Sequence, residues 1–277
     1  MGDVTMTTLT DRILFQKDPQ RFEKIRQEAA GFSSLFIGPN IIQDDIFSII
    51  ENYVEIKGLT LEWIRFPMED DELCACTFIR KGRIFVAVNT SLPLSKQIFA
   101  AAHELYHIHC YLNDNNSDLT VSGSILEAAT IDQGTLELEE MEANAFAGLL
   151  LVPSNDLLQQ IRIFRVNNDF SSFENILSLM DIFAIPYKAM TLRLYEEGII
   201  SDKQAKDLLS VPSKTIQNRI HLTGKAKRWE MKRTGNDKLG SLIENLTINT
   251  QNESLPKQRL QEDWNRLNQI KHEYGIE

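Results

Sequence analysis

The fold and chemistry of this chain are decided by the stretch Gln97-Ile-Phe-Ala-Ala-Ala-His-Glu-Leu-Tyr-His-Ile-His-Cys110. It contains a His-Glu-x-x-His pentapeptide made by His103, Glu104 and His107. No Pro or Gly interrupts this alanine-rich stretch, which predicts an α-helix. Residues four apart on a helix share one face, about 5–6 Å between Cβ atoms, so both imidazoles can bind one Zn²⁺ ion. Glu104 stands beside them, where its carboxylate can accept a proton from an attacking water.

A catalytic zinc site usually has a third protein ligand, and the sequence offers two carboxylates for it. Glu127 stands in a stretch rich in small polar residues, which indicates a solvated surface loop. Glu142 lies at the end of an apolar stripe that Phe146 and Leu149 or Leu150 form at helical spacing. A carboxylate in line with such a stripe points toward the core, where burial is costly unless it is paired or bound to a metal. We therefore expect Glu142 to be the third ligand.

The two segments together resemble the ImmA/IrrE metallopeptidases. In that family a His-Glu-x-x-His helix is followed, after a variable spacer, by a helix reading roughly Glu-x-Glu-Ala-x-x-Phe-Ala-x-x-Leu-Leu-x-Pro. The second pattern is matched here by Glu140–Pro153. The resemblance implies one Zn²⁺ per chain with the ligands His103, His107 and Glu142, and with Glu104 as the catalytic general base.

The resemblance covers about residues 40–200 and departs from the family pattern at two places. The motif more often has Gly at the position of Tyr106, so we expect this side chain to crowd or line the substrate cleft. The spacer 113–137 is long and polar. Its first part, 113–123, has few large apolar residues and predicts an exposed, mobile loop.

The activity that the resemblance implies is that of a gluzincin-like zinc endopeptidase, a peptide hydrolase that cuts a specific intracellular protein. Family members are linked to cleavage or inactivation of helix-turn-helix repressors, so the expected partner is a separately encoded XRE-type repressor, whose cleavage relieves repression. Two alternatives remain open. One is a zinc-bearing, non-catalytic regulator that binds a protein partner, and the other is a DNA-binding transcription factor that uses residues 171–200.

Composition and charge favour a soluble, cytoplasmic enzyme. The 277 residues carry a net charge of −10, which argues against broad nucleic-acid binding. No stretch approaches the roughly 18 apolar residues of a membrane span, and Met1-Gly-Asp-Val-Thr5 lacks the features of a signal peptide. Three cysteines, an odd number, do not suggest a disulfide framework. The basic run Lys225–Arg233 is an exception, best interpreted as a solvated face.

Hydrophobic periodicity predicts the α+β class, and the family resemblance implies a zincin-like metallopeptidase domain over residues 1–165. We expect amphipathic helices at 18–30 and 41–56, followed by a small antiparallel sheet and a pair of metal-binding helices. The expected strands are Leu59–Phe66, Leu73–Arg80 and Arg83–Asn89, the last two joined as a hairpin across Lys81-Gly82.

Short helices follow in a helix-turn-helix-like module over residues 166–213, with helices expected at Ser172–Phe183 and Tyr187–Glu197. The second of these carries two basic residues but also two glutamates and is less basic than a DNA-reading helix usually is. We expect the module to be structural or protein-binding. Residues 214–277 form a C-terminal helical extension, in which a helix over Leu255–Tyr274 has an apolar face that predicts docking on a domain or a partner.

Overall fold

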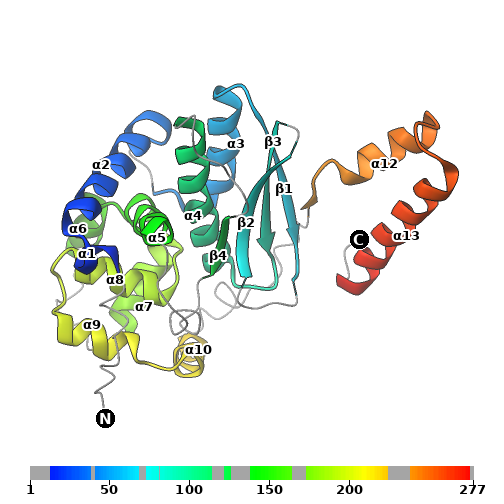
Figure 1. Ribbon diagram of the computed structural model, residues 1–277. Coiled ribbons are helices and arrows are strands. Elements are labelled where there is room, and N and C mark those ends of the chain that lie inside the picture. Colours follow the sequence, from blue (N-terminus) through cyan, green and yellow to red (C-terminus); the bar gives the residue numbers. More distant parts are fainter. Residues whose placement is uncertain are drawn as a thin grey trace, which may run out of the picture.

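A computed structural model describes residues 13–38, 41–68, 73–80, 82–113, 122–125, 138–163, 173–223 and 238–274. The fold is α+β, as predicted, with a small sheet packed beside a larger group of helices (Figure 1). Glu127, most of the predicted loop at 113–123 and the basic run Lys225–Arg233 lie outside the described residues. Among the described helices, none combines the length and the apolar character needed to cross a bilayer.

The N-terminal part consists of α1 (Leu14–Lys17), α2 (Pro19–Phe36), the short 3-10 helix η2 (Gln43–Asp45) and α3 (Ile46–Ile56). The start of α2 is fixed by Asp18, whose carboxylate accepts from the backbone N–H of Arg21 at 3.0 Å, and by Pro19 in the first turn. One face of α2 buries Phe22, Ile25, Ala29 and Phe32, so the predicted amphipathic helix is confirmed and extends to Phe36.

The sheet contains five strands in the order β4-β2-β3-β1-β5. They are β1 (Thr60–Phe66), β2 (Leu73–Arg80), β3 (Arg83–Asn89), β4 (Ser122–Ile125) and β5 (Lys238–Leu239). The predicted hairpin is confirmed, because β2 pairs antiparallel with β3 in a register that places Arg80 opposite Arg83. Gly82 in its turn has a φ of +73°, a conformation that favours glycine.

The prediction of an antiparallel sheet is wrong for one pair of strands. β1 runs parallel to β3, from Thr60 opposite Arg83 to Phe66 opposite Asn89. β3 lies between β1 and β2, so β1 and β2, which follow each other in the sequence, are not neighbours in the sheet. The central position of β3 agrees with its nearly continuous burial, because a central strand is covered on both faces. Alternating polarity predicts a strand but does not fix its partner.

Three helices follow the hairpin: α4 (Leu94–Asn113), α5 (Leu138–Leu151) and α6 (Ser154–Ile163). α4 is the central helix of the fold, packing against β2, β3 and β4 on one side and against α5 on another. Nearly every side chain from Ser95 to Ile108 is buried, which is what contact on several sides requires. Ala100, Ala101 and Ala102 are fully buried, and their small side chains let neighbouring elements approach α4 closely.

The helix-turn-helix-like region contains α7 (Phe173–Phe183), α8 (Tyr187–Glu196), α9 (Asp202–Leu209) and α10 (Ser213–Leu222). The two predicted helices are therefore present, as α7 and α8. A single cluster of buried apolar side chains extends from Leu14 in α1 to Ile220 in α10, so these helices share their core with the helices around α4. The proposed boundaries at 165 and 213 stay a prediction about independent folding.

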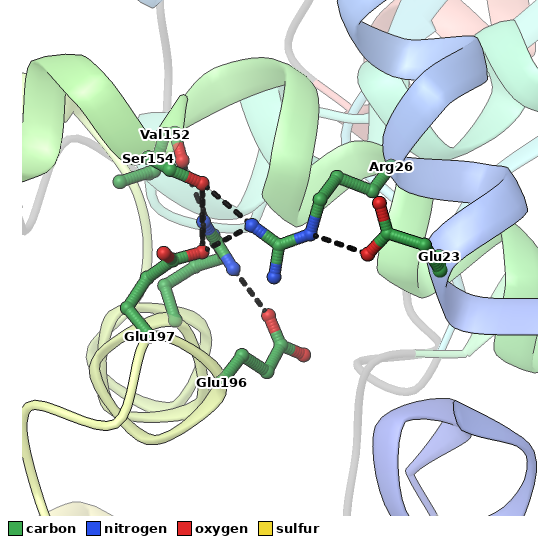
Figure 2. A network of polar contacts seen from close by, with 7 residues as sticks. Glu23, Arg26, Val152, Ser154, Glu196 and Glu197 are labelled. Atoms are coloured by element: carbon green, nitrogen blue, oxygen red, sulfur yellow. Dashed lines mark hydrogen bonds and ion pairs between the residues drawn. The ribbon is translucent and has the colours of Figure 1, made fainter. Parts of the chain in front are cut away.

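A network of ion pairs and hydrogen bonds joins α2, α6 and α8 (Figure 2). The side chain of Arg193 is 1% exposed and donates to Glu196 at 2.6 Å, to Glu197 at 2.7 Å and to the Val152 carbonyl at 3.2 Å. Arg26 of α2 donates to Glu197 and to the Ser154 hydroxyl, both at 2.8 Å. Burial raises the pKa of Glu196 although Arg193 lowers it, so this carboxyl depends on its partner.

We predict that Arg193→Ala lowers the free energy of unfolding by about 3–5 kcal/mol, because it leaves the buried Glu196 carboxylate without its cation, while Glu197 keeps Arg26. A matched control is Lys206→Ala, which removes an exposed pair with Asp202 at 3.0 Å and should cost less than about 1 kcal/mol. Urea unfolding of both variants measures the difference. Equal losses for the two would show that the network does not fasten α8 to the core.

The C-terminal extension leaves the sheet at β5 and forms a pair of helices, α12 (Leu242–Gln251) and α13 (Lys257–Tyr274), that project away from the body (Figure 1). The predicted apolar face of α13 is confirmed: Leu260 and Leu267 are buried, and Trp264 Nε1 donates to Thr250 Oγ1 of α12 at 2.9 Å. This face therefore packs on α12.

Glu62 of β1 attaches the extension to the sheet. Its carboxylate accepts from the backbone N–H of Ser241 at 2.8 Å, from the Ser241 hydroxyl and from Arg83 at 2.6 Å. Partial burial opposes ionisation, but these hydrogen bonds and the charge of Arg83 together hold the pKa of Glu62 below its ordinary value. The neighbouring Gly240 has a φ of +57°, and a Cβ there would lie 2.8 Å from the Glu62 carboxylate.

We predict that this attachment weakens in acid. A carboxyl whose pKa is lowered by folding stabilises fully above its unfolded pKa, about 4.3 for Glu, and loses that contribution as the pH falls through its lower folded pKa. Hydrogen-exchange protection factors of the Leu239 and Ser241 amides should therefore fall below about pH 4 in the wild type. In Glu62→Gln they should be low at every pH, and unchanged protection in that variant would contradict the assignment.

Candidate metal centre

The two histidines of the pentapeptide face one carboxylate across the interface between α4 and α5. His103 and His107 are 1% and 2% exposed, and their Nε2 atoms lie 3.2 Å apart. Glu140 of α5 places Oε2 3.1 Å from Nε2 of His103 and Oε1 3.4 Å from Nε2 of His107. Among the described residues these three form the group of side chains that could hold a metal ion, with ligand atoms within 4.8 Å of one another.

Glu142, the third ligand expected from the sequence, lies in a different environment. Its Oε2 accepts from the Tyr106 hydroxyl at 2.8 Å, and its Oε1 is paired with Nε of Arg21 from α2. Residues two apart on a helix are rotated by about 200°, so Glu140 and Glu142 face nearly opposite directions. The apolar stripe correctly indicated that Glu142 is buried, since it is 3% exposed, but Arg21 supplies the positive charge. The geometry thus favours Glu140 over Glu142 as the third ligand.

Both imidazoles are oriented through their second nitrogen. Nδ1 of His103 lies 2.9 Å from Oδ1 of Asn144, and Nδ1 of His107 lies 3.3 Å from Oε1 of Glu139. Asn144 follows Glu140 by four residues and therefore shares its face of α5. If each Nδ1–H donates to these oxygens, as it would with a metal bound, each Nε2 has a lone pair available for the ion. Such second contacts commonly fix the tautomer and direction of metal-binding histidines.

The donor set fits a zinc ion. The two Nε2 atoms lie 3.2 Å apart and face the same carboxylate, so a single ion could contact all three side chains. A tetrahedral ion with Zn–N bonds of about 2.0–2.1 Å separates its ligand atoms by roughly 3.3 Å, close to the spacing of the two Nε2 atoms. Two imidazoles and one carboxylate are also a common ligand set of catalytic zinc, with one position left open.

Negative charge accumulates around the two imidazoles. Burial lowers the pKa of His103, but the hydrogen bond to Glu140 and the charges of Glu104 and Glu140 outweigh it and raise that pKa. Burial likewise opposes ionisation of Glu140, yet its contacts with the two histidines hold its pKa below the ordinary value. A divalent cation would neutralise the same concentration of negative charge.

Glu104, the expected general base, is completely buried on α4 next to His103. Its carboxylate also lies near β2, because burial and then the charge of Glu104 raise the pKa of the Cys76 thiol on that strand. The structure thus brings His103 and His107 together, with Glu104 next to His103 on α4. Cys110 is partly buried against the core and is not in the metal-binding group.

Sequence reasoning missed Glu140, Glu139 and Asn144. One available signal was spacing: Asn144 stands four residues after Glu140, so these two polar side chains share a face of α5. The other signal was the apolar face that contains Glu142 and Phe146, which turns Glu142 away from Glu140.

The segment 68–195 matches the family model described as the IrrE N-terminal-like domain, Peptidase_M78. It contains α4, α5 and every residue of the candidate metal centre. The resemblance to the ImmA/IrrE family is therefore confirmed over these residues. A comparison with curated proteins found no match to the chain.

We predict that the purified protein binds about one Zn²⁺ per chain. His103→Ala, His107→Ala and Glu140→Gln should lose most of it, whereas Glu142→Gln should still reach about one equivalent at saturating Zn²⁺. Elemental analysis after dialysis against buffered zinc measures the content. Full zinc in Glu140→Gln together with loss in Glu142→Gln would return the ligand role to Glu142.

Proposed function

We propose that this protein is a zinc-dependent endopeptidase that hydrolyses a peptide bond in one specific protein. The observation that carries the proposal is the buried carboxylate of Glu104, next to His103 on the helix that supplies two ligands. With Glu140 as the proposed third ligand, Glu104 remains available for proton transfer. The Peptidase_M78 match over residues 68–195 supports this assignment.

The proposed roles follow from the positions of the side chains. His103, His107 and Glu140 would hold Zn²⁺, while Asn144 and Glu139 keep the imidazoles oriented. Bound zinc supplies Lewis acidity, which makes water a better nucleophile near neutral pH and polarises a carbonyl. Glu104 accepts the proton of the attacking water and delivers it to the amine that leaves.

The edge of the sheet beside α4 suits an extended peptide. β4 pairs with β2 on one side, and no other described strand pairs with its opposite edge. α4 packs against both β2 and β4, so this edge lies next to the helix that carries the histidines. An extended peptide can add to such an edge through main-chain hydrogen bonds, which would place its backbone near the metal ligands.

For the substrate we propose a separately encoded XRE-type helix-turn-helix repressor, whose cleavage would relieve repression. The family resemblance supports this choice, and such a substrate would meet the enzyme in the cytoplasm. The burial of Arg193 argues against DNA reading by α8, because this side chain is enclosed by carboxylates and cannot reach a phosphate. A protein that only binds its partner would not need a general base such as Glu104.

We predict that Glu104→Gln removes cleavage while leaving zinc binding intact. Glutamine has nearly the same shape as glutamate but cannot accept the proton, and general-base catalysis typically contributes about 10²–10⁴-fold in rate. Cleavage of the repressor encoded beside this protein should fall by that factor on co-expression, while binding of the repressor persists.

The control is Glu51→Gln, on α3 and outside the metal centre, which should cleave as the wild type does. If Glu104→Gln keeps full activity while His103→Ala abolishes it, the zinc is structural and the protein acts by binding.

A further inference from the structure

A second polar cluster adjoins the metal centre and joins three helices. It consists of Arg21 from α2, Tyr106 from α4 and Glu142 from α5, and is called the Glu142 junction below. Tyr106 precedes His107 in the chain, and their ring centroids lie 6.0 Å apart. Glu142 stands two residues after Glu140 on the other metal-binding helix. Each metal-binding helix thus contributes one residue to the junction.

The junction satisfies a carboxylate that would otherwise be costly to bury. Glu142 and Tyr106 are 3% and 4% exposed, whereas the Arg21 side chain is 48% exposed. The partly exposed Arg21 therefore supplies the positive charge that pairs with the buried Glu142 carboxylate. The Tyr106 hydroxyl donates to Oε2 of Glu142 at 2.8 Å. The Tyr106 ring also packs against Phe146 of α5, with ring centroids 5.4 Å apart.

We propose that Arg21 and Tyr106 are positioning residues that act through Glu142 to set the metal affinity. Glu140 and Glu142 point in nearly opposite directions from α5. Fixing Glu142 between α2 and α4 therefore fixes the rotation of α5 about its axis. That rotation determines whether the Glu140 carboxylate faces both histidines. The inference rests on the proposed zinc site, but not on peptidase activity.

This role distinguishes Tyr106 from a residue that lines the substrate cleft. Its buried hydroxyl donates a hydrogen bond to Oε2 of Glu142 at 2.8 Å. A glycine at this position could neither donate to Glu142 nor pack on Phe146. This chain therefore uses Tyr106 to connect its two metal-binding helices directly.

The test compares dissociation constants for Zn²⁺, measured by chelator competition, with melting temperatures of the zinc-free proteins. Tyr106→Phe removes only the hydroxyl, and Arg21→Gln removes the cation. Both should weaken zinc binding by about 10-fold or more, the effect typical of partners that orient metal ligands. Arg21→Lys keeps the charge and should bind zinc close to the wild-type level.

The matched control is Tyr53→Phe. Tyr53 is also buried and bonds to α4, through Nδ1 of His109 at 2.8 Å, but it does not contact Glu142. Its loss should lower the melting temperature about as much as Tyr106→Phe, with the zinc dissociation constant unchanged. Wild-type zinc affinity in Tyr106→Phe, or equal weakening in Tyr53→Phe, would overturn the proposal.

The outcomes also separate this inference from the proposed function. If the wild type binds zinc and the variants weaken it, but no protein is cut, the junction stands and the peptidase proposal fails. If the wild type binds no zinc, both are overturned. If Arg21→Gln does not fold, Tyr106→Phe still tests the proposal, because it removes only one oxygen atom and should not prevent folding.

Discussion

Two imidazole nitrogens held 3.2 Å apart on one helix are the interaction on which the rest of the structure depends. To hold them there, α4 is packed against the sheet on one side and α5 on another, with small alanine side chains preceding the motif. α5 then presents Glu140 to the two nitrogens, and Asn144 on the same face of α5 orients His103. The sheet and the surrounding helices enclose this pair of helices.

Burying charge is the second constraint, and the chain meets it in two ways. At the metal centre, carboxylates gather around two imidazoles, an arrangement that a divalent cation completes. Outside the group of possible ligands, buried carboxylates are paired with arginine, as Glu142 is with Arg21 and Glu197 with Arg193. Because an unpaired buried charge is strongly destabilising, these pairs also help to determine how α2 and α8 pack against their neighbouring helices.

Local patterns predicted much of this structure. The His-Glu-x-x-His helix, the strands of the hairpin and the helices α7 and α8 depend on short-range periodicity and turn residues, which the sequence displays directly. The pairing of segments that are distant in the sequence was harder to predict from local patterns. The parallel pairing of β1 with β3 depends on which strand takes the central position, and alternation within a strand does not encode that.

The third ligand shows the same limit at the level of one side chain. Sequence alone shows that Glu142 lies in line with an apolar stripe and must be neutralised, but not by what. The neutralising group is Arg21, more than a hundred residues earlier in the chain. Only the packing of α2 against α5 brings the two together. Glu142 is paired with Arg21, whereas Glu140, on the opposite face of α5, contacts the two histidines.

The central claim is that one metal ion is held by His103, His107 and Glu140. Anomalous diffraction at the zinc absorption edge, from crystals of the zinc-loaded protein, tests it most directly. We expect one peak, bonded to both Nε2 atoms at about 2.0–2.1 Å and to the Glu140 carboxylate at about 2.0–2.2 Å. A peak bonded to Glu142, or no peak between the two histidines, would contradict it.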